Sequence, residues 1–508
     1  MRFSKISAFV TAVMLLSIPM QKFSVPVLAE EHSEESMYGT IDLLSYTIRE
    51  DNTVKINFTD ITDGNIVIPA EIEGFPVTEL GDNVFQGREN ITSVILPDSI
   101  TVIGKNAFSG CTSLTSVNIP ANLKSLGAYA FENCPITEAV LPEMLDSVGA
   151  GAFSGCSLLK ELRIPDSVSE IGGAVCSNCT SLESLKLSAQ MTELPKENNI
   201  DFLENCISLK SITIPENLTR IESNPFKTCT ALETIEADEN NRIYTSVDGI
   251  LCTKTGLCLT VYPAGKTDKI CTLPEGITRI GTSAFCNTVY LEELILPSTL
   301  DRLGIAASAF LNCKSLKKVV IPEGLINLAA FTFWNCENLK EIVLPESLYS
   351  VMNGAFLNCS SLENIIIPDN VSKLDSNVFS GCTSLKSVTL GTRIKEIGSS
   401  IFKDCENLTD IYYTGTQEQW EKIAIQQKGN EFFQNVQIHF EESASEILTG
   451  DINQDGQVSV SDVILLQKYL HGQEAFTKSQ FQTADLTKDG KVNIFDFIKL
   501  KYLFLETK

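Results

Sequence analysis

Histidine and tryptophan are scarce in this chain of 508 residues, which contains three histidines and two tryptophans. No histidine lies between residues 33 and 438, and all sixteen cysteines fall inside that stretch. Histidine-dependent triads, ordinary zinc hydrolase sites and thiol nucleophiles with a histidine base are therefore excluded from it. A pair of carboxylates could still hydrolyse a glycoside, but no two acidic residues are marked out by their position. We expect a non-catalytic protein, with a carboxylate-dependent glycoside hydrolase as the most distant alternative.

Long hydrophobic runs and excess positive charge are also missing. Only residues 6–20 form a long apolar run, which is shorter than the roughly 20 apolar residues that span a bilayer. Arg2 and Lys5 precede that run, and Val27-Leu28-Ala29 places small residues where signal peptidase reads, which predicts a signal peptide and a secreted, extracellular protein. A retained N-terminal anchor is the alternative. The net charge of −25 disfavours nucleic acid and anionic membranes as partners, and we expect no membrane insertion.

A short unit recurs along most of the chain. Apolar runs that end in proline recur at Pro97, Pro120, Pro142 and Pro165, and again at Pro274, Pro297, Pro322, Pro345 and Pro368. The intervals of 22 to 25 residues match leucine-rich repeats, in which one short strand and one return segment make a coil. Leu362, Ile365 and Ile367 alternate toward one side, and Pro368 ends the strand because it has no amide hydrogen. One coil cannot fold alone, so we predict a β-rich, α+β solenoid of coils of about 23 residues.

Cysteine is abundant, and sixteen cysteines in an exported protein would ordinarily indicate disulfides. Eleven of them hold one position of the repeat, namely Cys111, Cys134, Cys156, Cys179, Cys206, Cys229, Cys313, Cys336, Cys359, Cys382 and Cys405. A small apolar thiol that recurs once per coil indicates packing, with one buried side chain per rung. Disulfides along this ladder are the alternative. A local pair among Cys176, Cys252, Cys258, Cys271 and Cys286 also stays open.

Both ends of the repeat region and one interruption have patterns of their own. Residues 38–60 contain two strand-like runs that we expect to cover the first coil, and residues 238–272 predict a β-hairpin excursion. Residues 411–443 predict a C-terminal cap with a short helix and a final strand. Repeat, excursion and the ending Tyr-Tyr-Thr-Gly-Thr-x-x-Gln-Trp together resemble the BspA-like bacterial leucine-rich repeat family. The resemblance implies a secreted or surface protein that binds other proteins or host molecules.

The sequence changes character after residues 444–449, which we interpret as a linker. Two loops, 34 residues apart, place oxygen-bearing side chains at positions 1, 3, 5, 9 and 12, and Gly456 permits the sharp turn of the first. Position 7 needs only its backbone carbonyl. The ligand positions are Asp451, Asn453, Asp455, Gln457, Ser459 and Asp462, then Asp485, Thr487, Asp489, Lys491, Asn493 and Asp496. Calcium prefers six to eight oxygens, so we predict two Ca²⁺ ions, and the shorter hydroxyl of Thr487, in place of Asn or Asp, makes the second site either weaker or completed by a water.

Each loop is followed by an amphipathic stretch, and both loops end in Asp rather than Glu. This pattern resembles the type I dockerin, a small all-α calcium-binding module with two loop-helix repeats that binds cohesin domains on scaffoldin proteins. The resemblance implies a cellulosome-like assembly and cohesin contacts at Val460, Ser461, Gln467, Lys468, Ile494, Phe495, Lys501 and Tyr502. Because the halves differ, Val-Ser against Ile-Phe, we expect one preferred binding orientation.

The outward positions of the predicted strands give a candidate surface on the solenoid. Four successive coils place Ile295, Val320, Val343 and Ile366 at one outward position, and such a stripe can mark a protein partner. The ordinary alternative is that Val and Ile suit any strand surface.

We predict a signal peptide at 1–29, a solenoid at 30–443, the linker at 444–449 and a dockerin at 450–508. The leading hypothesis is a secreted component of a complex attached to a cell surface or to substrate, whose solenoid presents a protein-binding or adhesion surface. A carbohydrate-binding accessory protein of polysaccharide degradation is the alternative. Sugar platforms favour rows of exposed aromatics, and Trp334 and Trp420 form no such row.

Overall fold

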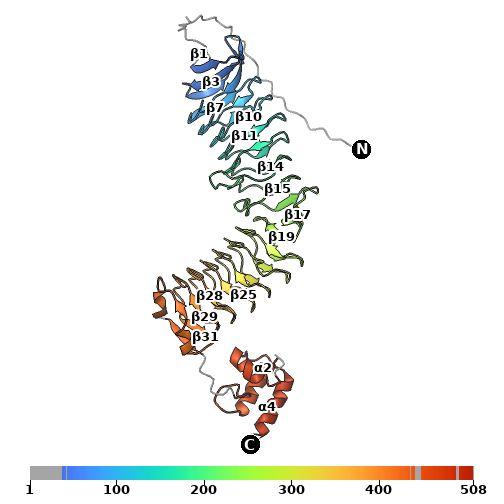
Figure 1. The fold of residues 1–508 in the computed structure, drawn as a ribbon, viewed down its shortest axis with the longest axis vertical. Coiled ribbons are helices and arrows are strands. Elements are labelled where there is room, and N and C mark those ends of the chain that lie inside the picture. The colour runs from blue at the N-terminus through green and yellow to red at the C-terminus, as the bar shows by residue number, and fades with distance from the viewer. Residues whose placement is uncertain (1–36, 42, 435, 441–447, 488–490, 507–508) are drawn as a thin grey trace, which may run out of the picture.

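The computed structural model describes residues 37–41, 43–434, 436–440, 448–487 and 491–506. The predicted signal peptide, most of the predicted linker and Asp489 of the second loop lie outside these residues. Short strands stack coil upon coil into an elongated, curved solenoid from β1 (Met37–Ile41) to β33 (Gln437–Phe440), and a small group of helices follows it in the chain (Figure 1). The predicted strand-rich solenoid and small helical module are confirmed.

The first part of the solenoid contains three sheets. The first sheet has the order β1, β2 (Leu44–Ile48), β3 (Val54–Thr59), β6 (Phe75–Leu80), β8 (Val102–Ile103), β10 (Ser125–Leu126), β11 (Ser147–Val148) and β13 (Glu170–Ile171), with β5 (Glu71–Ile72) beside β6. The others are β4 (Asp63–Val67), β7 (Asn90–Ile95) and β9 (Ser116–Val117), and β12 (Glu161–Arg163), β14 (Ser184–Lys186), β15 (Ser211–Ile214) and β16 (Thr234–Ala237). β1 pairs with β2 and β2 pairs with β3, both antiparallel. The N-terminal cap therefore has three strands where the sequence indicated two.

The second part repeats this arrangement. Its strand face contains β20 (Ile270–Thr272), β22 (Glu293–Ile295), β23 (Lys318–Val320) and β25 (Glu341–Val343), then β27 (Asn364–Ile366), β29 (Ser387–Leu390), β31 (Asp410–Tyr413) and β33. A second sheet contains β24 (Asn327–Leu328), β26 (Ser350–Val351), β28 (Lys373–Leu374), β30 (Glu396–Ile397) and β32 (Ala424–Ile425). The C-terminal cap adds the short helix α1 (Gln417–Trp420) and a 3-10 turn at Glu431–Gln434.

The interruption of the repeat forms a small sheet that lies between the hydrophobic cores of the first and second parts of the solenoid. It contains the antiparallel strands β17 (Tyr244–Val247), β18 (Ile250–Thr253) and β19 (Cys258–Val261), so the predicted hairpin has one strand more. β19 then returns to the parallel stack beside β21 (Arg279–Ile280). Leu251 and Val261 pack in the core of the first part, whereas Ile250 and Leu259 pack in that of the second. The inserted sheet is thus buried on both faces.

The repeat residues fill the coils as their spacing indicates. Leu362, Ile365 and Ile367 are buried, as their alternation predicts. The phenylalanines of the return side stack from coil to coil, with ring centroids 5.0 Å apart for Phe310 and Phe333. Burying these aliphatic and aromatic side chains in a continuous stack stabilises coils that could not fold singly.

The cysteine ladder lies beside this stack, and all sixteen cysteines are free thiols. Each ladder Sγ donates a hydrogen bond to a backbone carbonyl of the preceding coil, as Cys382 does to Phe356 at 3.1 Å. Burial raises the pKa of Cys179 and Cys229 to about 12. Neither the disulfide alternative nor the local pair is present in the structure, and the recurring thiol has a polar role that its spacing did not reveal.

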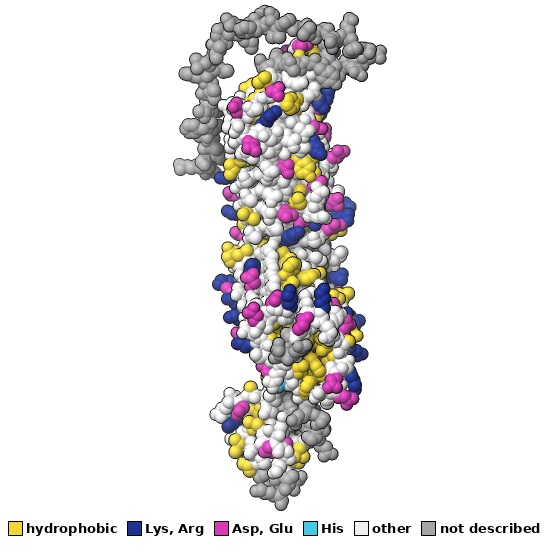
Figure 2. All heavy atoms as spheres, turned by 90° about the vertical axis from the view of Figure 1, so that its left-hand side faces the viewer, with side chains coloured by type: hydrophobic (Ala, Val, Ile, Leu, Met, Phe, Trp, Pro, Cys, Tyr) yellow, Lys and Arg dark blue, Asp and Glu magenta, His cyan; other side chains and the backbone are white. Residues whose placement is uncertain are grey.

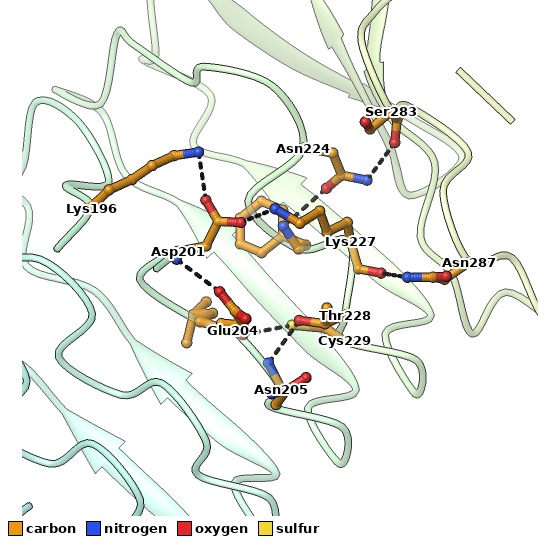
Figure 3. A network of polar contacts seen from close by, with 12 residues as sticks. Lys196, Asp201, Glu204, Asn205, Asn224, Lys227, Thr228, Cys229, Ser283 and Asn287 are labelled. Carbon is orange, nitrogen blue, oxygen red and sulfur yellow. Dashed lines mark hydrogen bonds and ion pairs between the residues drawn. The ribbon is translucent and has the colours of Figure 1, made fainter. Parts of the chain in front are cut away.

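A network of ion pairs fixes the irregular coils before the excursion (Figure 3). Asp201 lies five residues before the ladder cysteine Cys206, where the regular coils hold residues such as Asn106 and Ser308, and its side chain is buried. Lys196 Nζ lies 2.7 Å from Asp201 Oδ1, and Lys227 of the next coil contacts Oδ2. Asn287 Nδ2 donates to the carbonyl of Lys227 at 2.6 Å across 60 residues of sequence. The return side of the solenoid therefore continues past the excursion.

Candidate docking module and interaction surfaces

The first predicted calcium loop is closed by its own carboxylates. Asp451 Oδ2 accepts a hydrogen bond from the amide of Gly456 at 2.8 Å. Asp462 accepts from the amide of Ile452 at 2.7 Å and from that of Ser459 at 2.8 Å. Positions 1 and 12 therefore hold the two ends of the loop together, and both carboxylates are buried.

The second loop has the same closure at position 12. The amides of Thr487 and Asn493 donate to Asp496 at 2.9 and 2.8 Å, and Thr487 Oγ1 donates to it at 2.8 Å. Burial by itself raises the pKa of the Asp496 carboxyl, but these hydrogen bonds outweigh it, so the pKa lies below its ordinary value. Thr487 Oγ1 also lies 3.5 Å from Asp485 Oδ1. The substituted residue thus lies between two predicted ligand carboxylates.

The donor chemistry of both loops fits calcium. Asp462 and Asp496 are buried carboxylates, and neither forms an ion pair with Lys or Arg among the described residues. A buried charge of this kind needs a counter-charge, which a metal ion supplies. Within the described residues, no three acidic, cysteine or histidine side chains gather around one point, and the first-loop carboxylates instead accept loop amides. The side chains of Asp451, Asn453 and Asp455 would complete the oxygen set.

Three helices build the module, α2 (Val460–Leu470), α3 (Lys478–Ala484) and α4 (Ile494–Glu506). Ser459 caps α2 through a capping box, which makes this predicted ligand residue a helix cap as well. The sequence reasoning missed α3, which precedes the second loop. Its signal was Thr477 followed by Gln480, which form a capping box at its start. Leu466 of α2 and Leu500 of α4 share the small core of the module.

The module exposes large apolar side chains in two matching sets, one on α2 and one on α4. Val460 and Ile464 lie one turn apart on α2, and Ile494 and Ile498 lie one turn apart on α4, each 34 residues later. Ile464 and Ile498 are 49 % and 45 % exposed, and the sequence reasoning missed both. Phe495, 67 % exposed, breaks the correspondence because its counterpart in the first half is a serine.

The remaining predicted cohesin contacts are polar. Ser461, Gln467 and Lys468 are exposed on α2, and Lys501 is exposed on α4, where its Nζ lies 4.4 Å from the ring centroid of Phe497. Tyr502 belongs to α4, but its side chain lies outside the described residues. Apolar and polar candidates thus follow both helices.

The predicted stripe on the solenoid is exposed. Ile295, Val320 and Val343 are in register on β22, β23 and β25, and each is nearly half exposed. Ile366, 70 % exposed, starts the adjoining sheet, where it is in register with Thr389 of β29. On the face of the molecule turned toward the viewer in Figure 2, hydrophobic side chains form patches between charged ones, more of them along the lower half of the solenoid.

An aromatic pair continues the same outward position toward the C-terminal cap. Tyr412 of β31 follows Thr389 in register, and His439 of β33 follows Tyr412. The two rings stack with centroids 4.6 Å apart, and His439 Nε2 lies 2.7 Å from Asp410 Oδ1. The hydrogen bond from His439 is the chief cause that holds the pKa of Asp410 below its usual value. The exposed stripe therefore ends in an aromatic and polar group.

Neither tryptophan is fully exposed, and Trp334 is half-buried. Trp420 is buried in the cap, and the indole Nε1 of Trp334 is shielded from solvent. No helix in the part of the chain that the structure describes is long and apolar enough to cross a bilayer.

Comparisons with known proteins agree with both parts of the chain. A profile of the BspA type leucine rich repeat region matches residues 78–202, 196–247, 266–307 and 303–431. A profile of the dockerin type I domain matches residues 449–505. A type I dockerin implies a cohesin partner and, in general, bound calcium, and both families are typically non-catalytic. A comparison with curated proteins gave no match.

Solved structures of bacterial leucine-rich repeat proteins share the solenoid. A leucine rich cell surface protein from Faecalibacterium prausnitzii A2-165 is 28 % identical, with a TM-score of 0.57, over 77 % of this chain and 98 % of that chain. A leucine-rich repeat protein from Bacteroides ovatus is 28 % identical, with a TM-score of 0.58, over 80 % and 100 %. The pneumococcal vaccine antigen PcpA, 21 % identical with a TM-score of 0.50 over 81 % and 100 %, shares the fold. The chain belongs to the BspA type leucine rich repeat family and carries a dockerin type I domain at residues 449–505.

Proposed function

We propose that this chain is a secreted, non-catalytic component of a cellulosome-like assembly, held there by a cohesin domain that binds residues 450–508. The observation that carries the proposal is the pair of matching apolar faces on α2 and α4, next to two loops with buried carboxylates. A small helical module leaves such side chains exposed at a cost in solubility, which a partner surface offsets. The exposed Phe495 is the natural anchor of that contact.

Calcium has a structural part in this proposal. The two loops together contain six carboxylates. Bound Ca²⁺ offsets both the repulsion between these carboxylates and the cost of burying their charges. Ser459 couples calcium binding to the start of α2, because it belongs to the first loop and also caps that helix. Removal of calcium should therefore release the loops, then the helix ends that present the apolar faces.

A capture experiment tests the docking. Full-length protein is applied to an immobilised type I cohesin in calcium and in excess EGTA, and melting is followed by circular dichroism under both conditions. We expect EGTA to abolish capture and to remove only the transition of the helical module, with return of both when calcium is restored. Undiminished capture in EGTA would contradict the proposal.

The solenoid, in the same proposal, presents a protein-binding or adhesion surface along the exposed stripe. Replacing Val343 and Ile366 by lysine should abolish capture of the solenoid's ligand from arrayed host and microbial surface proteins. Thr213→Lys together with Ser211→Lys, at exposed positions of β15, is the matched control because it adds the same charge elsewhere on a strand face. Equal capture by both double variants would discard the stripe as the binding surface.

A further inference from the structure

The regular hydrogen bonding between successive coils of the first sheet is interrupted at one coil. In successive coils a glycine amide donates to the carbonyl of the preceding coil, as Gly149 does to Leu126 and Gly172 does to Val148, both at 2.8 Å. The next coil has Pro195 at this place, and proline has no amide hydrogen. Among the described residues, no hydrogen bond reaches the carbonyl of Ile171 from that coil, and β13 is the last strand of its sheet.

The break extends over a whole rung. In earlier coils the amide of the residue just before the short strand donates to the coil before it, as that of Ser169 does to the carbonyl of Asp146 at 3.1 Å. Within the described residues, Thr192 makes no such bond to Ser169, although Thr219 of the following coil donates to Thr192 at 2.9 Å. Segment 191–195 therefore pairs with the coil after it and has separated from the coil before it.

The separation opens a groove of about 620 Å³ across four coils. Hydroxyl, amide and carboxylate side chains line it, with exposed Glu170 and Gln190 among them. Ser125 and Ser147 are in register on neighbouring strands, and their Oγ atoms are 2.9 Å apart. The buried side chains of Leu126, Val148, Val168 and Met191 close the floor.

The groove is held open by its neighbours. Lys196, directly after Pro195, is fixed by the buried carboxylate of Asp201, which Lys227 of the next coil also contacts (Figure 3). Glu193 at the groove wall lies 3.5 Å from Arg220 of the same following coil. Segment 191–195 is therefore tied to the later coils at Glu193 and just after Pro195, and these contacts hold it apart from β13.

We propose that this groove binds a linear glycan. Its rungs repeat hydroxyl and carboxylate groups at the strand spacing of about 4.8 Å, close to the length of one sugar unit in an extended β-1,4-linked chain. Vicinal sugar hydroxyls both donate and accept, so they match serine hydroxyls, the Gln190 amide, the Glu170 carboxylate and the unpaired backbone groups of the broken rung. The residues that line the groove include no aromatic side chain, so recognition there would depend on hydrogen bonds to the sugar hydroxyls and not on ring stacking.

The test uses full-length protein and isothermal titration with cellohexaose and xylohexaose. At least one hexasaccharide should bind with a sub-millimolar Kd. Ser147→Phe, which fills the groove, should weaken binding at least tenfold. Ser350→Phe is the matched control, because Ser350 occupies the same repeat position on β26. Absence of binding by both sugars, or equal affinity of Ser147→Phe and wild type, overturns the proposal.

Two further arms keep the test decisive. If Ser147→Phe does not fold, as judged from its melting transition, Gln190→Ala replaces it with the same expected loss of affinity. A hexathreonine peptide offers hydroxyls and backbone amides without sugar rings. Binding of this peptide but of neither hexasaccharide would assign the broken rung to polypeptide and overturn the glycan proposal. None of these results depends on cohesin binding, so they leave the proposed docking function untouched.

Discussion

Cys336 Sγ donates its hydrogen to the carbonyl oxygen of Phe310, 3.1 Å away in the preceding coil. The Phe310 carbonyl is buried. The side chain of a serine in place of Cys336 would be shorter than that of the thiol, and alanine or valine would leave the carbonyl without this donor. A thiol combines a weak donor with an apolar surface, which explains why the repeat uses cysteine at this position.

Truncation of a ladder thiol should therefore be costly. Cys336→Ala loses the hydrogen bond and leaves a cavity, and we expect the free energy of unfolding to fall by about 1–3 kcal/mol. Urea denaturation of the solenoid measures it. Cys258→Ala, half-buried and off the ladder, is the control, with an expected change below about 0.5 kcal/mol. A similar loss in both variants would remove the special role of the ladder.

The thiols should be almost inert in the folded protein. Burial raises the pKa of Cys405 and Cys286 to about 12 and those of Cys252 and Cys271 to about 11. Since the thiolate is the reactive form, iodoacetamide at pH 8 should modify chiefly the partly exposed Cys258 in the folded protein, and all sixteen cysteines in urea. Mass spectrometry of the intact protein counts the adducts. Rapid native modification of most thiols would contradict the buried ladder.

Asp462 closes the first loop by accepting hydrogen bonds, and this role can be distinguished from its charge as a predicted calcium ligand. Asp462→Ala leaves the loop amides of Ile452 and Ser459 without an acceptor, which should lower the stability of the module by about 3 kcal/mol. Asp455→Ala, at an exposed loop position, should weaken calcium binding with a smaller loss of stability at saturating calcium. Calcium titrations followed by circular dichroism compare them. Equal stability of the two variants at saturating calcium would show that closure is unimportant.

Substitutions on the two apolar faces of the module should weaken cohesin capture to different extents. Ile498→Asp lies on the α4 face, which also contains the exposed Phe495, and should weaken cohesin capture at least tenfold. Ile464→Asp lies on the α2 face, beside Ser461, and should have little effect if one orientation is preferred. Surface plasmon resonance on immobilised cohesin measures both. Small effects of either single substitution, with complete loss in the double variant, would show that the two orientations are equivalent.

The carboxylate of Asp201 and the lysine that contacts it should respond in opposite ways. Asp201→Ala removes a buried charge together with the cost of its desolvation, so stability should change little or rise. Lys227→Ala leaves that carboxylate buried with Lys196 as its cation, and should lower the free energy of unfolding by about 3 kcal/mol. Thermal melting of both variants decides. A larger loss for Asp201→Ala would show that the ion pairs stabilise this coil.

The sequence by itself determined the repeat, the buried aliphatic and aromatic positions, and the dockerin loops. Each of these depends on spacing along the chain, because a coil is closed by residues such as Leu362 and Pro368 that are near one another in sequence. The missed helix α3 belongs to the same class, since Thr477 and Gln480 form its capping box. Local chemistry of this kind can be read before any coil is stacked on another.

Only the tertiary structure decided what lies between coils. The bond from Cys336 to Phe310 joins residues 26 positions apart, and the contact of Asn287 with Lys227 crosses 60. The sequence analysis gave Pro195 no role, and its effect appears only where it meets Ile171 of the coil before it. Such contacts depend on which edges of successive coils face each other, and a periodic sequence specifies the coil more directly than the places where two coils fail to pair.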